Sequence, residues 1–534
     1  MIKEELETII ENAIKNLQKK GELSAFSIPK ILIEHPREKL RGDYSTNISF
    51  LISKNIAKNP VEAAMLLKSE IENEKSIIQK VEIIGGFVNF FISDDYFRKQ
   101  LPVILKKKNN FGNLKIGKNE KVNVEFISAN PTGPLTLGNG RGGFCGDVLA
   151  NVLAKAGYKV KREYYINDIG NQINKLGHSV IGNEHALYKG EYIIELRKKI
   201  KGNNFEKVGE RASKIILDKM IKPSVKKMGI KFDFWFSEKS LYKNKEVDKV
   251  IEELSKKGFT YKSEGALWFK SRDLGDDKDR VLIREDGIKT YFASDMAYLR
   301  NKFKRGFNHL IILLGADHYG YVARLKAGAY ALGYKKESVN DIVVQLVKLF
   351  EKGKEVRMSK RTGIYITIDE LINEVGLDVA RFFFLTRGSN THFNFNLDLA
   401  KEKSDKNPVF KVQYAYARIC SIIKKSFGHK SAGKAKIKSK INYEALSEPS
   451  ELNLIRQFVI FLEVIEDTAR DYQVQRMPQY STELADAFHS FYESCQVITE
   501  DKELSQARLN LVLATKIVLK NTLNLMGISA PEKM

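Results

Sequence analysis

Cysteine and long apolar runs are both scarce in this sequence of 534 residues. The three cysteines, Cys145, Cys420 and Cys495, are odd in number and far apart, which excludes a disulfide framework and a Cys-x-x-Cys metal knuckle. No apolar run reaches the roughly 18 residues that a membrane helix needs, and residues 1–20 lack the apolar core of a signal peptide. We therefore expect a cytoplasmic protein with no structural metal and no membrane partner.

Acidic residues are few relative to basic ones. Asp and Glu total 66 against 89 Lys and Arg, which gives a formal net charge of +23. Residues 1–110 hold 18 basic and 15 acidic residues and residues 401–534 hold 20 and 16, so most of the excess lies between them. This charge favours a polyanionic partner, either nucleic acid or acidic lipid. Hydrophobic residues make up 43% of the chain, which excludes a disordered tail protein and, at about 150 residues per domain, predicts three or four domains.

Hydrophobic periodicity predicts a small α/β domain over residues 1–110. Apolar residues recur at helical spacing over residues 4–17. Residues 80–92 read KVEIIGGFVNFFI, which is typical of two strands joined by a tight turn. A polar segment with two glycines and six lysines follows at 105–121, and we place the first domain boundary there.

The middle of the chain predicts an α/β fold with a Rossmann-like parallel sheet. Strand-like residues 122–127 lead into a glycine-rich loop, a helical segment at 144–156 and a second strand at 158–166. This order is a strand-loop-helix-strand unit of the nucleotide-binding type. We expect the domain to span residues 111–400, with its sheet continuing to about residue 350 and a helical insertion at about 180–280.

The last part of the chain predicts an all-α bundle over residues 401–534. Long helical patterns occupy residues 452–472 and 507–527, with almost no strand signal. Within this part, residues 424–440 carry seven lysines and no acidic residue. The lysine-rich segment is either a loop near a polyanion or a solvated linker.

The glycine-rich loop has five glycines within residues 130–143, between a strand and a helix. Backbone amides and the helix dipole attract phosphate at such a position. The spacing fits neither Gly-x-x-x-x-Gly-Lys-Ser/Thr nor Gly-x-Gly-x-x-Gly, so the P-loop and dinucleotide interpretations fail.

The loop sequence ANPTGPLTLGNGRGG resembles the signature loop of class I aminoacyl-tRNA synthetases in its arginyl form. The family usually has His-x-Gly-His where this sequence has Thr136-Leu137-Gly138-Asn139. The resemblance implies catalytic roles for Thr136, Gly138 and Asn139, whose neutral donors replace the two imidazoles. Because a Thr-x-Gly-Asn version is similar to that of tryptophanyl-tRNA synthetases, we expect an active enzyme. A catalytically silent tRNA-binding paralogue is the alternative.

A second segment, Arg357-Met358-Ser359-Lys360-Arg361, resembles the family's Lys-Met-Ser-Lys-Ser motif, and a basic surface turn is the alternative. The resemblance implies that Lys360 meets the pyrophosphate leaving group, with Arg357 as a second cation and Ser359 as a hydroxyl donor. It also implies a set of ATP-binding residues: Pro131, Thr132, Gly133, Pro134, Leu135, Leu137, Gly140, Gly315, Asp317, Met358 and Arg361.

Three segments resemble the arginine pocket of the arginyl enzymes. VEFISAN supplies Glu125, Ser128 and Asn130, YFASDMAY supplies Tyr291 and Asp295 on one helix face, and the third segment is YYINDIGNQI at 164–173. The resemblance also places GADH, which contains His318, in contact with the ATP ribose or the bound amino acid. A carboxylate is the natural partner of a guanidinium group. Glu125 as a satisfied strand-end carboxylate and His318 as a structural residue are the alternatives. Asn167 and Asp168 either support the pocket or act as turn and helix-cap residues.

Both ends of the chain resemble tRNA-binding parts of the same family. Residues 42–47 and 85–90 resemble the N-terminal domain, in which Phe87 stacks on a D-loop base and Asn89 hydrogen-bonds to one. Core packing of Phe87 is the alternative. Segments 378–382, 407–418 and 527–534 resemble the helical anticodon-binding domain, and we expect the aromatic-rich helix at 413–419 to face anticodon bases.

The resemblance implies a two-step ligation. L-arginine and ATP with Mg²⁺ give arginyl-adenylate, and the arginyl group passes to the 3′-terminal ribose of tRNA(Arg). We expect a monomer. A cysteinyl enzyme is excluded because its zinc site needs clustered ligands that three scattered cysteines do not supply. Dependence of the first step on bound tRNA stays open.

Overall fold

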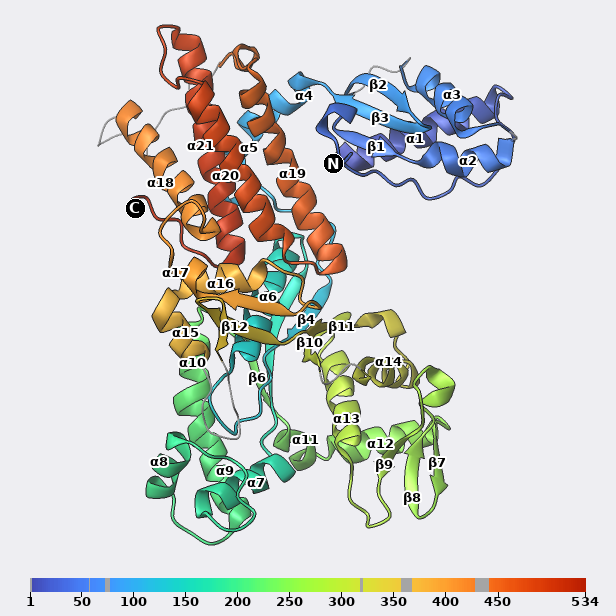
Figure 1. The fold of residues 1–534 in the computed structure, drawn as a ribbon. Helices are drawn as coiled ribbons and strands as arrows, with labels where there is room; N and C mark the ends of the chain where they lie inside the picture. The colour runs from blue at the N-terminus through green and yellow to red at the C-terminus, as the bar shows by residue number, and fades with distance from the viewer. Residues whose placement is uncertain (1, 57, 73–76, 317–319, 357–366, 428–440) are drawn as a thin grey trace. The chain divides into compact units, whose positions relative to one another are not determined.

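The structure is a computed structural model that describes residues 2–56, 58–72, 77–316, 320–356, 367–427 and 441–534 (Figure 1). By its internal contacts the chain forms two compact units. The first contains residues 1–108, 426–462 and 487–515, and the second contains residues 109–425, 463–486 and 516–534.

The first unit is built on a three-stranded antiparallel sheet of order β1-β3-β2. The strands β2 (Ile78–Ile84) and β3 (Phe87–Ile92) form the predicted hairpin, and β1 (Tyr44–Thr46) pairs with the far edge of β3. Both turn glycines, Gly85 and Gly86, have positive φ, a conformation that glycine adopts without strain. The periodic segment near the N-terminus forms α1 (Ile2–Lys19), which packs on α3 (Pro60–Glu72) and buries its apolar face.

Further helices complete this unit. They are α2 (Ile48–Ile56), α4 (Asp94–Arg98), α5 (Gln100–Lys107) and parts of α19 (Pro449–Asp471), α20 (Arg476–Ser494) and α21 (Lys502–Met526). Arg456 forms ion pairs with Asp43 and Asp94, and so links α19 to the N-terminal segments. A buried ion pair between Arg508 and Glu451 joins α21 to α19 at 2.6 Å.

The second unit contains the predicted parallel sheet. Its five strands have the order β11-β10-β4-β5-β6, and every neighbouring pair is parallel. They are β4 (Lys121–Glu125), β5 (Lys159–Ile166), β6 (Phe234–Ser237), β10 (His309–Gly315) and β11 (Val339–Val344). After β4 the chain adds β5 and then β6 on one side, and it later adds β10 and β11 on the other side of β4. The strand order therefore reverses between β4 and β10, where open parallel sheets bind their ligands.

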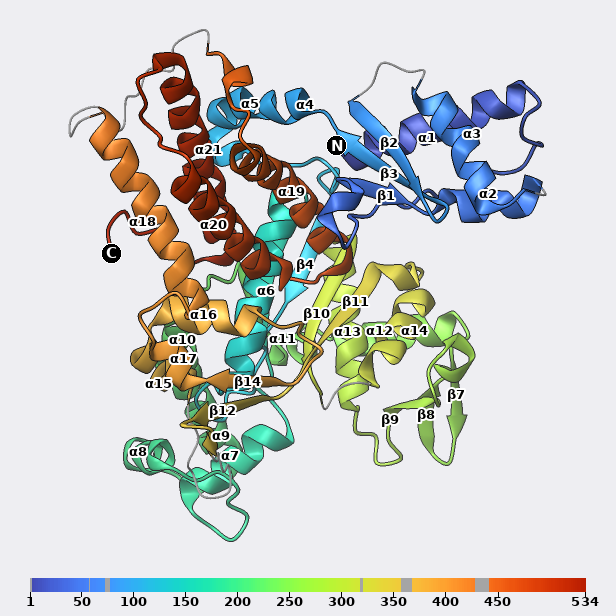
Figure 2. The ribbon, with the colours of Figure 1, turned by 45° about the horizontal axis from the view of Figure 1, so that its top comes forward.

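Three helices lie next to this sheet and position the site. The helix α6 (Leu137–Lys155) connects β4 to β5, α13 (Tyr291–Lys304) precedes β10, and α14 (Tyr321–Ala331) connects β10 to β11 (Figure 2). The glycine-rich loop thus joins a central strand to the long helix α6. The Rossmann-like fold class predicted from the sequence is confirmed.

The stretch between β5 and α13 is more varied than the expected helical insertion. Its helices are α7 (Asn171–Ile181), α8 (Glu191–Lys199), α9 (Phe205–Ile216), α10 (Lys222–Lys227), α11 (Lys239–Lys243) and α12 (Glu246–Lys256). The stretch also supplies β6 of the parallel sheet and a separate antiparallel sheet of β7 (Thr260–Ser263), β8 (Ala266–Phe269) and β9 (Arg280–Ile283). Strands of four residues are too short to show a clear period of two.

A third small sheet and four helices follow β11. They are β12 (Val347–Glu351), β13 (Lys354–Val356), β14 (Phe393–Asn396), α15 (Ile368–Val375), α16 (Leu377–Leu385), α17 (Leu397–Lys401) and α18 (Pro408–Phe427). The buried guanidinium of Arg141 in α6 donates to the carbonyls of Gln345, Gly388 and Thr391 at 2.7–3.0 Å. This arginine links α6 to the two segments that lead into the parallel strands β12 and β14.

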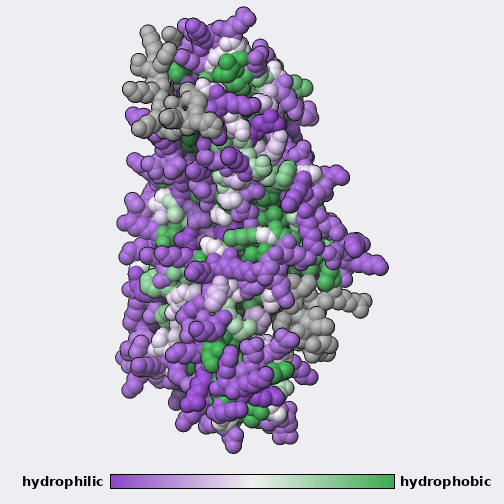
Figure 3. All heavy atoms as spheres, turned by 90° about the vertical axis from the view of Figure 1, so that its left-hand side faces the viewer, coloured by the Kyte–Doolittle hydropathy of each residue, from purple (hydrophilic) through white to green (hydrophobic). Residues whose placement is uncertain are grey.

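Polar side chains predominate on the face drawn in Figure 3, and the apolar ones form small separate patches there. None of the helices in the described ranges has the length and the apolar composition of a membrane span.

Candidate active site

The glycine-rich loop ends in a capping box at the start of α6. Thr136 is the N-cap, and its hydroxyl accepts from the backbone N–H of Asn139 at 3.4 Å. In return Asn139 Oδ1 accepts from the Thr136 backbone N–H at 3.0 Å and from its hydroxyl at 2.9 Å. The two residues that replace the family's histidines therefore fix the N-terminal start of the helix, where the helix dipole favours an anion.

A second capping box lies beside the first. Thr367 caps α15, and its hydroxyl accepts from the N–H of Glu370 at 3.2 Å. An antiparallel bridge pairs Thr367 with Thr136, and the N–H of Ile368 donates to the carbonyl of Leu135 at 3.1 Å. Two helix N-termini thus begin next to each other, at the end of the loop that follows β4. Their combined dipoles suit a ligand with several phosphates.

The other residues of this segment that are predicted to bind ATP lie in the loop between β4 and α6 or in the first turn of α6. Pro131, Leu135 and Leu137 are buried, whereas Gly138 is exposed. The carbonyl of Thr132 accepts from the Tyr192 hydroxyl at 3.0 Å. A Cβ at Gly133 would lie 3.2 Å from that same hydroxyl, so the loop packs closely on α8. The residues Pro134 and Gly140 complete this part of the predicted set.

Glu125 lies at the carboxyl end of β4 and is almost buried, with 7% exposure. One of its oxygens accepts from the Ser128 hydroxyl at 3.1 Å, and the other accepts from the ammonium group of Lys302. The Ser128 hydroxyl in turn accepts from the N–H of Tyr165 at 3.1 Å. Ile127 and Ser128 both have positive φ, 67° and 37°. Positive φ is uncommon for residues other than glycine, and it is rarer still for a β-branched residue such as Ile127. Backbone strain of this kind concentrates at functional sites.

A second carboxylate, Asp295, stands on α13 and faces the same region. Burial raises the pKa of Asp295 to about 7, and the charges of Glu238 and Glu125 act in the same direction. A hydrogen bond from Tyr321 and the charge of Arg324 oppose this pKa rise. Glu125 and Asp295, which the sequence analysis placed in one pocket, are therefore close enough to interact.

Glu238, directly after β6, is a third carboxylate of the cluster, and its side chain is 2% exposed. Burial raises the pKa of Glu238 to about 7 despite hydrogen bonds with Ser294 and Tyr165. With its amide turned to satisfy both of its polar atoms, Asn167 donates to Glu238 Oε2 at 2.9 Å. Three carboxylates in a partly dry site suit a guanidinium group.

The remaining residues of the predicted arginine site lie at its mouth. Asn130 is exposed, and Tyr291 is 49% exposed at the start of α13. The Tyr291 hydroxyl accepts from the backbone N–H of Asn171 at 3.2 Å. Asp168 accepts from the Ser237 hydroxyl at 2.5 Å and from the N–H of Lys239 at 2.9 Å. Asp168 thus fixes the start of α11, as its helix-cap alternative suggested.

Several predicted residues fall outside the described ranges. They are Asp317 and His318 after β10, and Arg357, Met358, Ser359, Lys360 and Arg361 of the second motif. Gly315 is described and is the exposed last residue of β10, at the carboxyl edge of the sheet. The roles of these residues stay predictions.

Sequence reasoning missed two members of the cluster, Lys302 and Glu238. Lys302 lies seven positions after Asp295 on α13, and its side chain is 1% exposed. The sequence offered little signal for Lys302, because a lysine seven positions after Asp295 on one helix face suits an exposed position equally well. Glu238 offered no such signal, because the sequence does not show that β6 lies at the edge of the parallel sheet.

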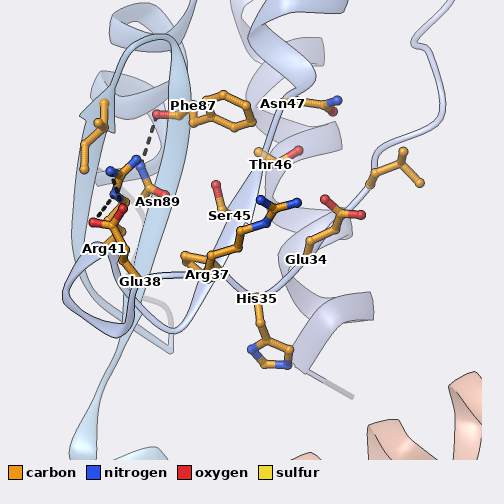
Figure 4. Close-up of a pocket in the computed structure, with 13 residues that line it drawn as sticks. Glu34, His35, Arg37, Glu38, Arg41, Ser45, Thr46, Asn47, Phe87 and Asn89 are labelled. Carbon is orange, nitrogen blue, oxygen red and sulfur yellow. Dashed lines mark hydrogen bonds and ion pairs between the residues drawn. The ribbon is translucent and has the colours of Figure 1, made fainter. Parts of the chain in front are cut away.

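The predicted tRNA residues Phe87 and Asn89 line a pocket in the first unit, with a volume of about 290 Å³ (Figure 4). The Phe87 ring is 45% exposed and tilts against Phe50 at a centroid distance of 5.1 Å. Asn89 is 3% exposed, and its amide donates to the carbonyl of Phe87 at 3.4 Å. His35, Arg37 and Arg41 lie around the same pocket (Figure 4). Glu34 and Glu38 also line this pocket, and Glu38 pairs with Arg41. The exposure of the Phe87 ring favours the stacking prediction over core packing.

The aromatic-rich helix of the predicted anticodon domain is part of α18. Tyr416 is fully buried, whereas Tyr414 is partly exposed and its hydroxyl accepts from Arg418 at 2.6 Å. Gln413 donates to Asp378 at 2.8 Å and to the carbonyl of Ser529 at 3.1 Å. Within segment 413–419, Tyr414 rather than Tyr416 is therefore the aromatic side chain that a base can reach.

Family models match most of the chain in three consecutive parts. The arginyl-tRNA synthetase N-terminal domain matches residues 4–92, and the catalytic domain of class I (R) tRNA synthetases matches residues 100–186 and 183–386. The DALR anticodon-binding domain matches residues 412–534. Together these models cover both units of the structure.

Curated relatives match over their full length. The chain is 42% identical to an arginine–tRNA ligase of Acetivibrio thermocellus, covering 100% of this chain and 99% of the relative. It is 44% identical to an arginine–tRNA ligase of Carboxydothermus hydrogenoformans, covering 97% and 96%.

Solved structures give the same result. A putative arginyl-tRNA synthetase from Campylobacter jejuni matches with a TM-score of 0.74 and 31% identity, covering 83% of this chain and 100% of that one. The Thermus thermophilus arginyl-tRNA synthetase is 20% identical, covers 100% of both chains and has a TM-score of 0.77, and so supports the fold alone. The chain belongs to the arginyl-tRNA synthetase family.

Proposed function

We propose that the chain joins L-arginine to tRNA(Arg) in two steps, as an ATP-dependent class I ligase. In the first step an oxygen of the arginine carboxylate attacks the α-phosphorus of ATP, and pyrophosphate leaves. In the second step a hydroxyl of the terminal ribose of tRNA attacks the carbonyl carbon, and AMP leaves. The observation that carries this proposal is the grouping of Glu125, Asp295 and Glu238, together with two adjacent helix N-termini at the end of the loop that follows Glu125.

For ATP we propose that the phosphates lie at the start of α6. Thr136, Gly138 and Asn139 form its first turn, where the N–H groups and the dipole favour negative charge. The capping box holds that turn in place before ATP binds. Fixed donors stabilise developing charge without reorganising during the reaction. Pro131 to Leu135, Leu137, Gly140 and Gly315 shape the rest of the nucleotide site in this proposal.

For arginine we propose that Glu125 and Asp295 receive the guanidinium group, with Tyr291 at the mouth of the pocket. Ser128 and Asn130 lie at the end of β4, towards the nucleotide loop, and we assign them to the amino and carboxylate end of the substrate. His318 belongs to the same proposed set. Burial makes each charge-assisted hydrogen bond stronger than it would be in water.

The second motif completes the proposal. Lys360 and Arg357 neutralise the pyrophosphate leaving group, Ser359 donates a hydrogen bond to it, and Asp317, Met358 and Arg361 contact the nucleotide. Mg²⁺ enters with ATP as part of the substrate complex. No side-chain nucleophile is required, because positioning and charge neutralisation supply the rate.

Phe87 and Asn89 are proposed to contact the tRNA, and the net charge of +23 favours that polyanion. We further propose a cytoplasmic monomer whose domains are bounded near residues 110 and 400. A catalytically silent paralogue gains no support, since the two histidine replacements form an ordered helix cap.

The test is aminoacylation of unfractionated tRNA with labelled arginine and Mg-ATP, with the other nineteen amino acids as competitors. Asp295→Asn is expected to abolish charging, whereas Asp286→Asn, at the exposed turn before α13, is its matched control. Lys360→Ala is expected to cost about 2 to 4 kcal/mol of transition-state stabilisation. Binding of tRNA with no charging of any amino acid would refute the proposed function.

A further inference from the structure

Lys302 holds a buried positive charge next to the carboxylate of Glu125 in the candidate site. Its side chain is 1% exposed, and its ammonium group contacts Glu125. The same ammonium lies 4.3 Å from the centre of the Tyr298 ring, an arrangement that stabilises a cation. Lys302 lies on the helix that also carries Asp295, so one element supplies both a carboxylate of the pocket and the cation behind it.

A second carboxylate near Lys302, Glu163, has hydrogen-bond partners of its own. Despite burial, its pKa is lowered by a hydrogen bond from Arg305 and by the charges of Lys302 and Arg305. Glu163 on β5 accepts from both terminal nitrogens of Arg305 at 2.5 and 2.7 Å, and from the Tyr298 hydroxyl at 2.5 Å. Asn123 donates to it as well, at 3.1 Å. These hydrogen bonds to Glu163 therefore all come from residues other than Lys302. The direct partner of Lys302 is Glu125, at the site itself.

Glu125 retains acceptor capacity while it contacts Lys302. Ser128 and Lys302 each donate to a different oxygen of the carboxylate. An ionised carboxylate offers about four lone-pair sites, so positions remain for a guanidinium group. The two contacts fix both the place and the orientation of the carboxylate before the substrate arrives.

We propose that Lys302 is a positioning residue of the arginine site, whose charge holds the Glu125 carboxylate in the orientation that receives the guanidinium group. This inference rests on the proposed function and extends it to a residue that does not touch the substrate. It acts on arginine binding alone, because the described contacts of Lys302 do not include the nucleotide loop.

The groups around Glu125 determine how its carboxylate responds when the charge of Lys302 is removed. Glu125 and Lys302 have Asp295 as a titratable neighbour. Among the described residues, the other titratable and charged groups near these three are Glu163, Tyr165, Glu238, Tyr242, Tyr298, Arg305, Tyr321 and Arg324. Without Lys302 the buried carboxylate of Glu125 faces further carboxylates and loses its ion-pair partner. A proton then replaces the ammonium, and arginine must displace that proton to bind.

The experiment compares Lys302→Met with Lys304→Met, which removes the same charge from an exposed position on the same helix. For both variants, the KM values for arginine and for ATP are measured in aminoacylation assays between about pH 6 and 9. We expect Lys302→Met to raise the arginine KM by about 10- to 100-fold, with kcat and the ATP KM within about threefold. The slope of log KM for arginine against pH should become steeper by about one unit, which corresponds to one more proton released when arginine binds.

Two further variants separate the charge from the packing. Lys302→Arg keeps the charge and is expected to restore the wild-type pH profile. Lys302→Gln fills similar space without a charge and is expected to show the steeper profile. An unchanged arginine KM in both neutral variants overturns the proposal, and so does a parallel change of kcat and both KM values with no change in pH profile. If neither neutral variant folds, the role is structural and the proposal is withdrawn.

The wild-type protein distinguishes this inference from the proposed function. If the wild type charges arginine and the neutral variants match it, only the role of Lys302 fails. If the wild type charges no arginine, the proposed function fails first and the inference falls with it.

Discussion

A methyl group of Ile368 occupies the space beside Gly140. A Cβ at Gly140 would lie 2.5 Å from Ile368 Cδ1, well inside van der Waals contact. Gly140 lies in the first turns of α6, and Ile368 begins α15 directly beside it. The close approach of the two capped helix ends therefore requires a residue without a side chain at position 140.

Gly140→Ala is expected to push α15 away from α6 and to disturb the proposed phosphate site. Overpacking of this kind destabilises a protein by about 1 to 3 kcal/mol, and we expect aminoacylation to fall at least tenfold. Thermal unfolding and steady-state kinetics measure the two effects. Gly138→Ala is the control for stability alone, since its Cβ would meet nothing nearer than 3.7 Å. A wild-type melting temperature for Gly140→Ala would contradict this account of the contact.

Arg381→Met is expected to destabilise the second unit. The buried guanidinium pairs with Asp147 in α6 and donates to the carbonyl of Met228 at 2.9 Å and to that of Met526. Its loss leaves two buried carbonyls without this donor, while Asp147 keeps Arg162 as an ion-pair partner at 3.1 Å, and we expect a cost of about 1 to 3 kcal/mol. The midpoint of thermal unfolding should fall by several degrees. Arg387→Met, at an exposed position in the following loop, should leave the midpoint within about one degree.

The sequence predicted the parts of the fold that carry a strong period. The hairpin at β2 and β3, the helices α1 and α21, and the parallel sheet around β4 are confirmed. The short strands β6 to β9 were not predicted, because four residues do not establish a period of two. In the site, a strand-end glutamate and a helical aspartate could be matched to a motif. The dependence of Glu125 on Lys302 could not, because that contact joins residues 177 positions apart.

Arginine binding is expected to strengthen as the pH rises through neutrality. The pKa values of Asp295 and Glu238 are both raised to about 7 by burial, so each carboxyl is partly protonated there in the free protein. A guanidinium group prefers both carboxylates ionised, and its binding therefore releases protons. Calorimetry of arginine binding near pH 7, in buffers of different ionisation enthalpy, measures that release. Glu238→Gln should reduce the number of protons released, and equal release in both proteins would exclude Glu238 from the linkage.

The same two carboxyls affect stability with the opposite sign. The folded pKa of each lies above its unfolded value, so the folded state holds more protons between about pH 4 and 7. Their contribution to the free energy of unfolding is therefore full at the acid end of this window and declines as the pH rises through 7. This contribution is measured by urea unfolding of the free wild-type protein and of Glu238→Gln at about pH 5.5 and about pH 8. A variant whose pH dependence equals that of the wild type would contradict the buried environment of Glu238.

Phe87→Ala is expected to weaken tRNA recognition without affecting the chemistry. The ring is 45% exposed above a pocket that also contains Asn89, and stacking of one base on an aromatic ring is worth about 1 to 3 kcal/mol. The KM for tRNA should therefore rise by about 5- to 100-fold, while the KM values for arginine and ATP stay unchanged. Met65→Ala, which removes another exposed apolar side chain of the same unit from outside the pocket, is the matched control. Because the ring also contacts Phe50 at 5.1 Å, the melting temperature is measured in parallel. A fall in stability with an unchanged KM for tRNA would assign Phe87 to packing rather than to the nucleic acid.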